Sequence, residues 1–187
     1  EGKNLNIYIN SGGGSVFAGI AIYNMLKRHS GYKTVYVDGM AASIASVIAL
    51  AGDRVIIPSN AFLMIHKPYA ACIGNAEECR KLAADLDAIE TGILNIYKEH
   101  LADGVDIADI QKMVAEETWL NGEEAAKYFT VEVGAAKEYA AKFTDTVSAY
   151  AKVPKEIIKS ARAADNIAEK TAEKIKRVVI DGISKGV

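Results

Sequence analysis

The chain has 187 residues, of which half are hydrophobic and a quarter are charged, and this composition is typical of a globular domain with ample material for a core. Its formal net charge of −2 gives no overall electrostatic attraction to nucleic acid, so no nucleic-acid partner is expected. The sequence has no apolar run of about 18 residues, so no membrane span is expected, and no signal-peptide pattern at its start.

The first residues of the chain indicate whether it has been processed, and its cysteines indicate the redox state of its compartment. The sequence opens at Glu1 and soon enters a strand-like stretch, so we expect a fragment or a processed form. Cys72 and Cys79 are the only cysteines and are seven residues apart. They could lie near each other on a helix, but we expect two free thiols in a reducing, cytoplasmic compartment.

Strand and helix patterns alternate over the first third of the chain. Strands are expected at residues 4–10, 34–38, 54–57 and 61–66, and helices at residues 16–28 and 43–51. Two stretches rich in small residues, 11–15 and 39–42, are expected to be turns between them. Strands that alternate with helices predict an α/β domain with a largely parallel sheet.

The patterns that follow are mainly helical. We expect a loop at 67–75, a long helix at 76–101, helices at 106–116 (capped by Asp106) and 122–128, and a closing strand at 130–133. These elements complete a domain of residues 1–134. Residues 135–187 are predicted to form a separate helical extension of one or two helices. The better candidate for a helix within it is the segment 155–183. The extension carries a net charge of +4, but its mixed signs do not support a basic arm that binds nucleic acid.

Ser43 is the first candidate for chemistry. It follows a predicted strand, stands at the head of an apolar helix, and has Ala41, Ala42 and Ala45 as small neighbours. Backbone N–H groups at a helix start favour negative charge, and small neighbours would let a substrate backbone approach. These properties suit a nucleophilic serine. An ordinary N-cap serine occupies the same kind of position, so both interpretations stay open on this evidence.

The glycines and one histidine add two weaker signals. Gly12, Gly13 and Gly14 connect a strand to a helix, where freed N–H groups can face a reacting carbonyl; no nucleotide-binding signature accompanies them. His66 ends an apolar strand, the place where ligands of α/β sheets bind, although a structural core histidine fits as well. His29 and His100 lie near helix ends and are expected to be structural.

A serine nucleophile needs a base, and the base needs an acceptor that holds its tautomer. With 24 Asp and Glu residues in the chain, spacing alone selects no acid. Glu116 and Glu117 are candidates because they lie where a helix is predicted to end beside bulky apolar residues.

Four segments resemble, in the same order, the motifs of ClpP-like serine peptidases. These segments are Asn10–Val16, Gly39–Ser43, Met64–Pro68 and Glu117–Leu120, the last followed by Glu123-Glu124-Ala125. The resemblance covers residues 4–133 and is closest to the prophage-encoded branch that is linked to head maturation. It implies a crotonase-like spiral of βαβ units, in which the long helix at 76–101 is a handle that joins rings of subunits.

The same resemblance assigns the catalytic residues. Ser43 takes the position of the nucleophile, His66 that of the base, and Glu117 that of the acid, where aspartate is usual in the family. Glu117 has one methylene more than aspartate, so its carboxylate would need a slightly different reach to the histidine, and Glu116 stays an alternative.

The substrate-binding positions follow in the same way. The backbone N–H groups of Gly13 and Ile44 would form the oxyanion hole, and Gly14 could pair with the substrate backbone. The sequence departs from the family pattern at Gly12, where proline is usual, and at residues 129–132, which end the domain.

The leading hypothesis is therefore a serine endopeptidase that works through an acyl-enzyme, with no metal and no cofactor. Its substrates would be extended peptides or unfolded proteins, including phage capsid or scaffold precursors. Its partners would be further copies in a ring, heptameric or stacked, and an ATPase. The rivals are a catalytically inactive, ring-forming ClpP-like assembly protein, a crotonase-like acyl-CoA enzyme, and a Ser–Lys dyad peptidase that uses Lys67 or Lys81.

Overall fold

The computed structural model describes residues 2–136 and 145–159 of the chain. The strands are β1 (Leu5–Ser11), β2 (Lys33–Ala42), β3 (Arg54–Pro58), β4 (Phe62–Ile65), β5 (Thr118–Asn121) and β6 (Glu132–Gly134). The helices are α1 (Val16–Arg28), α2 (Ile44–Ala49), α3 (Ala76–Glu99), α4 (Ile107–Ala115), α5 (Gly122–Tyr128) and α6 (Asp145–Ser148). Residues 155–159 are also helical, and the rest of the helix expected at 155–183 lies outside the described residues.

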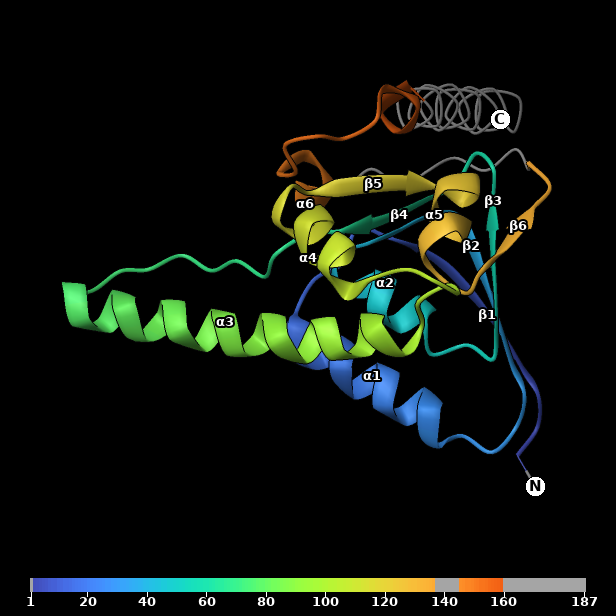
Figure 1. The fold of residues 1–187 in the computed structure, drawn as a ribbon, viewed down its shortest axis with the longest axis horizontal. Coiled ribbons are helices and arrows are strands. Elements are labelled where there is room, and N and C mark those ends of the chain that lie inside the picture. Colours follow the sequence, from blue (N-terminus) through green and yellow to red (C-terminus); the bar gives the residue numbers. More distant parts are fainter. Residues whose placement is uncertain (1, 137–144, 160–187) are drawn as a thin grey trace, which may run out of the picture.

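The strands form one sheet around β2 (Figure 1). The first half of β2 pairs with β3 and its second half with β4, while β1 pairs with the first half of β2 and, after a register shift, with Ala41. All three pairings are parallel, and β6 adds to β3 in parallel as well. The largely parallel α/β architecture expected from the sequence is therefore confirmed.

Strand β2 is longer than expected, because residues 39–42 continue it and do not form a turn. Met40, Ala41 and Ala42 pair with Phe62, Leu63 and Met64 of β4. The three residues of β2 are completely buried, and their backbone groups are satisfied by the neighbouring strand. Small residues suggested a turn, but here they fit a strand that is covered on both faces.

Strand β5 was not expected, and the closing strand is shifted. β5 pairs antiparallel with β4, with Trp119 opposite Met64 and Leu120 opposite Leu63. Only two residues separate it from α4, and its one local signal was the short run Thr118–Leu120, in which Thr and Trp favour strands. β6 begins two residues later than the strand expected at 130–133.

Helix α3 extends well beyond the sheet, and the loop from β4 runs back along it (Figure 1). Asn75 caps its N-terminus and forms a reciprocal capping box with Glu78. Asp106 caps α4 as expected, by accepting a hydrogen bond from the N–H of Ala108. Among the helices of the described residues, none combines the length and the apolar character that crossing a bilayer requires.

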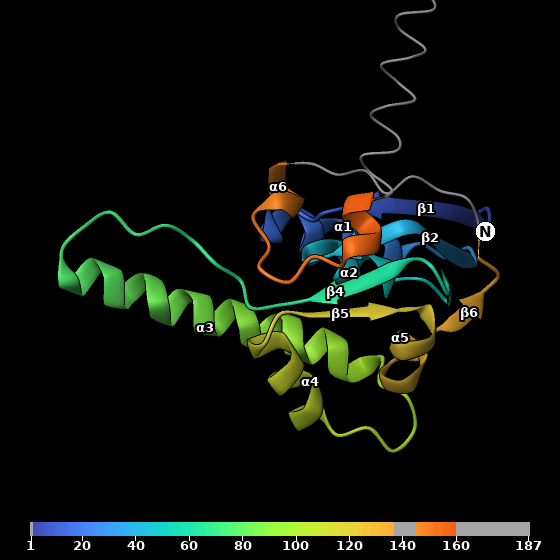
Figure 2. The same cartoon turned by 90° about the horizontal axis from the view of Figure 1, so that it is seen from above.

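The two faces of the sheet carry separate apolar clusters. Alternate residues of a strand point to opposite faces, so Ala41 and Leu63 join the main core, which α1 to α5 enclose. The second cluster consists of buried and partly buried side chains from β2, β4, β5 and the C-terminal segment: Met40, Ala42, Met64, Val147, Tyr150 and Ile157, with Phe62, Trp119 and Val153. Figure 2 shows α6 and the next helical turn over this part of the sheet.

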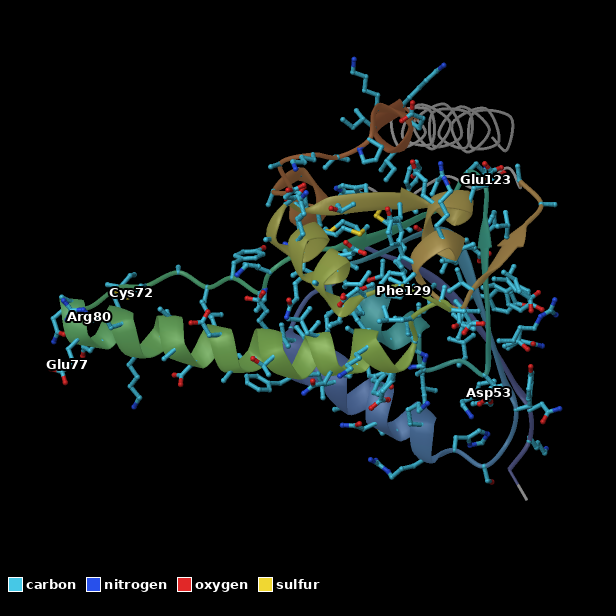
Figure 3. The ribbon with its side chains drawn as sticks, in the orientation of Figure 1. Asp53, Cys72, Glu77, Arg80, Glu123 and Phe129 are labelled. Carbon is cyan, nitrogen blue, oxygen red and sulfur yellow. A yellow bond between two sulfur atoms is a disulfide. The ribbon has the colours of Figure 1, made fainter. Side chains whose placement is uncertain are left out.

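The expectation of two free thiols was wrong. Cys72 and Cys79 form a disulfide with Cα atoms 5.8 Å apart. Cys72 lies in the loop before α3 and Cys79 in its first turn, so the loop folds back onto the helix. In Figure 3, Cys72 lies beside Arg80 and Glu77 at the end of α3 that is remote from the sheet.

Candidate active site

Ser43 and His66 meet because of the strand topology. Ser43 directly follows β2 and His66 directly follows β4, and these strands are parallel neighbours. Their carboxyl ends therefore lie at the same edge of the sheet. There the Nε2 atom of His66 lies 2.8 Å from the Oγ atom of Ser43, which is hydrogen-bonding distance.

The backbone of Ser43 adopts a conformation that L-residues rarely take, with φ 57° and ψ −130°. Its N–H donates to the carbonyl of Met64 at 2.9 Å, which extends the pairing of β2 with β4. Its carbonyl accepts from both the N–H and the hydroxyl of Ser46, at 2.9 Å and 2.5 Å. Such strain persists only where the surroundings fix it, and it occurs mainly at functional sites.

The glycine loop after β1 passes directly against Ser43. A Cβ atom on Gly13 would lie only 2.7 Å from Cβ of Ser43, so this approach requires glycine, as does the φ of +95°. The N–H of Gly13 donates to the hydroxyl of Ser11 at 3.2 Å. Gly14 borders open space, and Ile44 is the first residue of α2, where an N–H has no partner inside the helix.

His66 is partly buried, and two tyrosine rings lie against its imidazole. Tyr150 meets its ring edge to face with centroids 5.1 Å apart, and Tyr69 lies on another side at 5.8 Å. Burial lowers the pKa of His66 below 6.5, because the charged imidazolium loses hydration, and the negative charge of Glu117 partly opposes this effect. A neutral imidazole at neutral pH is the form that can accept a proton.

Glu117 lies near His66 but is held by other groups. Burial alone would raise the pKa of Glu117, but its carboxylate accepts hydrogen bonds from the N–H groups of Lys152 and Ala151, at 2.7 Å and 3.0 Å, and from Trp119. These bonds, with the electrostatic influence of His66, bring the pKa below its ordinary value. Within the described residues no hydrogen bond joins Glu117 to His66. Glu116 caps the end of α4, and its carbonyl accepts from the ammonium group of Lys152.

Three residues around the site were not found from the sequence. Ser46 and Tyr97 are buried and hydrogen-bonded to each other at 2.7 Å, so they connect the Ser43 turn to α3. Tyr150 comes from the segment after α6, and its hydroxyl donates to the carbonyl of Gly12 at 2.5 Å. The sequence does show that Ser46 lies one helical turn after Ser43. Tyr150, by contrast, belongs to no motif and gave no signal.

The other candidate bases lie elsewhere. The ammonium group of Lys67 pairs with Glu90 of α3 at 3.0 Å. The ring of His29 contacts the carbonyl of Lys3 at 2.7 Å, and that of His100 lies 3.2 Å from the hydroxyl of Tyr23. Of the three histidines, therefore, His66 is the one beside Ser43.

Comparisons with known proteins agree with these motifs. The family model of Clp protease matches residues 1–133. An ATP-dependent Clp protease proteolytic subunit from Bacteroides fragilis is 32% identical over 130 residues, covering 68% of this chain and 61% of that protein. Proteins of the same name from Bacteroides thetaiotaomicron and Chlorella vulgaris are 32% identical over 133 and 135 residues, covering 68% and 71% of this chain and 58% and 66% of theirs.

The chain thus matches about three fifths of the length of the curated relatives. The aligned region contains β1 to β5, the glycine loop, Ser43 and His66. The match over residues 1–133 and the mixed α/β fold agree with each other. On this evidence the chain belongs to the Clp protease family.

Proposed function

We propose that the chain is a serine endopeptidase in which Ser43 is the nucleophile and His66 is the general base. The observation that carries the proposal is the 2.8 Å separation of Ser43 Oγ and His66 Nε2 at the ends of two parallel strands. The strained backbone at Ser43 and the lowered pKa of His66 support it, because both are typical of catalytic groups.

The reaction would proceed by acyl transfer. His66 Nε2 accepts the proton of Ser43 as Oγ attacks the carbonyl carbon of a peptide bond. The imidazolium then gives this proton to the leaving amine, and an acyl ester on Ser43 remains. Water, deprotonated by the same imidazole, hydrolyses the ester and restores the hydroxyl.

We assign Glu117 as the acid and the N–H groups of Gly13 and Ile44 as the oxyanion hole. The charge of Glu117 already favours the protonated form of His66, which is the effect that a triad acid contributes. Gly13 lies against Ser43 and Ile44 follows it, so both amides are near the atom where the oxyanion would form. In this proposal the amide of Gly13 leaves the Ser11 hydroxyl, and Gly14 pairs with the substrate backbone.

Two observations favour the histidine over a lysine base. The Lys67 ammonium group is paired with Glu90, whereas the imidazole of His66 is at hydrogen-bonding distance from Ser43. Lys81 lies in the first turns of α3, in the part of this helix that extends away from the sheet (Figure 1). A Ser–Lys dyad would require one of these lysines to approach Ser43.

We further propose that the protein works as a subunit of a ring, with an ATPase partner that delivers unfolded chains. The relatives are named proteolytic subunits of an ATP-dependent protease. On this chain, Phe17 and Met25 of α1 and Ile73 before α3 are highly exposed apolar side chains, which suit contacts between subunits. Cytoplasmic location and a role in phage head maturation are also proposed, the latter from the likeness of the four motifs to the prophage branch.

A fluorophosphonate probe tests the catalytic assignment, because it reacts covalently with an activated serine. We expect labelling of the 187-residue chain at Ser43, shown by peptide mass spectrometry, and none in Ser43→Ala. His66→Ala should slow labelling by about 10²- to 10⁴-fold. Lys67→Ala is the matched control and should be labelled at nearly the parent rate.

Three results would contradict the assignment: no labelling of Ser43 in the parent chain, labelling that is insensitive to His66→Ala, or labelling that depends on Lys67. The first would favour an inactive assembly protein or an acyl-CoA enzyme, because neither needs a reactive Ser43. The last would favour a Ser–Lys dyad.

A further inference from the structure

The segment from Val147 to Ile157 covers the candidate active site. Val147, Tyr150 and Ile157 are buried against Met40 and Met64 of the sheet, with Phe62, Trp119 and other members of the second apolar cluster around them. This face of β2, β4 and β5 is the one that the helices of the main core leave open. The segment is therefore packed against the sheet and is not a loose appendage.

Tyr150 is the centre of this contact. Its ring meets the rings of His66 and Trp119 edge to face, with centroids 5.1 Å and 6.0 Å away. Its hydroxyl donates to the carbonyl of Gly12 and also interacts with the hydroxyl of Ser43. One side chain thus reaches the glycine loop, the candidate nucleophile and the candidate base.

The backbone after Tyr150 binds Glu117. The amides of Ala151 and Lys152 donate to its two carboxylate oxygens, and the Lys152 ammonium group donates to the carbonyl of Glu116. Hydrogen bonds to a charged acceptor are stronger than those between neutral groups. The carboxylate proposed to support His66 is therefore held by the same segment that covers Ser43.

A peptide substrate would need the space that Tyr150 fills. Its carbonyl carbon must come within about 3–3.5 Å of Ser43 Oγ, and its oxygen must face Gly13 and Ile44. Tyr150 brings a phenol hydroxyl to this place. A phenol has no carbonyl carbon for Ser43 to attack, so no acyl group can pass from it to Ser43, and the segment lies there without being cleaved at that point.

We infer that residues 147–157 are an intramolecular ligand of the active site, anchored by Tyr150 and by the hydrogen bonds from the Ala151 and Lys152 amides to Glu117. This ligand must leave before a peptide substrate can bind. The inference rests on the proposed function. It also defines a binding site beside Ser43, lined by Met40, Met64, Trp119 and His66, that accepts an aromatic side chain with a terminal hydroxyl.

Two measurements on the full 187-residue chain test the inference. The first is the rate at which a fluorophosphonate labels Ser43 in the parent chain, Tyr150→Ala, Tyr150→Phe and Tyr32→Ala. We expect labelling of Tyr150→Ala to be about tenfold faster, because the competent fraction of molecules rises when the cover is weakened. Tyr150→Phe keeps the ring and loses only the hydroxyl contacts with Gly12 and Ser43, so it should show a smaller gain. Tyr32→Ala makes the same chemical change at an exposed residue before β2 and should match the parent.

The second measurement is hydrogen exchange of the Ala151 and Lys152 amides, carried out in a Ser43→Ala background that prevents self-cleavage. These amides should exchange slowly when Tyr150 is present and quickly in Tyr150→Ala. Slow exchange reports the docked segment without requiring any enzymatic activity.

The outcomes separate this inference from the proposed function. The inference is wrong if the two amides exchange freely with Tyr150 present, if Tyr150→Ala leaves them protected, or if their release does not speed labelling of a reactive Ser43. If the two amides exchange faster in Tyr150→Ala but Ser43 is labelled in neither chain, the assignment of Ser43 as the nucleophile fails. The role of the segment in controlling access to Ser43 then fails as well, although the exchange data still show that the segment is docked. Faster labelling together with faster exchange supports both.

Discussion

The hydroxyl of Tyr97 lies 2.7 Å from the hydroxyl of Ser46, and both side chains are buried beneath the candidate active site. Ser46 donates its only hydroxyl hydrogen to the carbonyl of Ser43, so Tyr97 must donate to Ser46. Burial raises the pKa of Tyr97, which keeps it a neutral donor. The long helix α3 is thereby connected through two hydroxyls to the strained turn at Ser43.

The hydrogen bond between the Tyr97 and Ser46 hydroxyls predicts how single and double substitutions change the free energy of unfolding. Ser46→Ala leaves the buried Tyr97 hydroxyl without its partner and should lower the free energy of unfolding by about 1–3 kcal/mol. In the double variant with Tyr97→Phe, both partners are gone, so the loss should be smaller than the sum of the two single losses. Chemical denaturation measures all four chains, and additive losses would show that the two hydroxyls are not coupled.

The same substitution should also affect catalysis. Ser46→Ala frees the carbonyl of Ser43 from one of its two hydrogen bonds, so the proposed nucleophile would be less well oriented. We expect slower fluorophosphonate labelling of Ser43, with the Tyr97→Phe chain less affected because Ser46 still holds Ser43. Labelling at the parent rate in Ser46→Ala would mean that Ser46 serves stability alone.

Gly13→Ala should inactivate the site. The new Cβ would lie 2.7 Å from Cβ of Ser43 and 2.8 Å from the carbonyl oxygen of Ala42, at a φ of +95° that alanine disfavours. Displacement of the loop would move one proposed oxyanion donor, and we expect labelling to slow by about 10²-fold or more. Near-parent labelling in this variant would remove Gly13 from the proposed site.

Gly92→Ala is the matched control for the glycine substitution. Gly92 lies within α3, and a Cβ there meets no atom within 4 Å. Alanine should therefore raise the free energy of unfolding by about 1 kcal/mol and leave the labelling of Ser43 unchanged. Calorimetry and the labelling assay together check that the Gly13 effect is local.

The protonation of His66 predicts the pH dependence of labelling. The proposed base accepts a proton only when it is neutral, and burial lowers the pKa of His66 below 6.5. The labelling rate should therefore fall as the pH falls through a midpoint below 6.5. Glu117→Gln removes the charge that raises the pKa of His66, so this midpoint should move to still lower pH.

Glu123→Gln is the control for this shift, because Glu123 is an exposed residue in the first turn of α5 and does not influence the pKa of His66. Its pH profile should match the parent profile. A midpoint that rises in Glu117→Gln, or one that does not move, would contradict the assignment of Glu117 as the acid beside His66.

The disulfide predicts an effect on stability without an effect on the site. Cys72 and Cys79 close a short loop at the end of α3 that is remote from the sheet (Figure 3). Replacing both by serine should lower the free energy of unfolding by about 2–3 kcal/mol in the chain-entropy account, with the labelling of Ser43 unchanged. Alkylation of the denatured, unreduced chain provides a direct check, since modification of both thiols would show that the bond is absent.

Much of the fold could be predicted from the sequence because its signals are local. The helix at Val16–Arg28 has the bounds that its apolar spacing predicts, and Asp106 caps α4 as expected. The placement of Ser43 and His66 after two predicted strands was also local information, and the parallel pairing of β2 with β4 then brings the two strand ends together. The catalytic roles of Ser43, His66, Glu117, Gly13, Gly14 and Ile44 stay predictions.

The errors concern residues whose state depends on distant partners. Met40, Ala41 and Ala42 have the composition of a turn, but β4 satisfies their backbone and makes them a strand. Cys72 and Cys79 are bonded because the loop folds back along α3. No local pattern encodes either contact.

The sequence by itself determined the α/β class, the order of the elements apart from β5, and the presence of a serine, a histidine and a glycine loop after strands, because periodicity and turn chemistry are properties of neighbouring residues. Only the tertiary structure decided that Glu117 binds the backbone of Ala151 and Lys152, and that Tyr150 lies between Gly12, Ser43 and His66. These contacts join residues that are far apart in the chain, and they form only when packing on the second face of the sheet brings the C-terminal segment over the site.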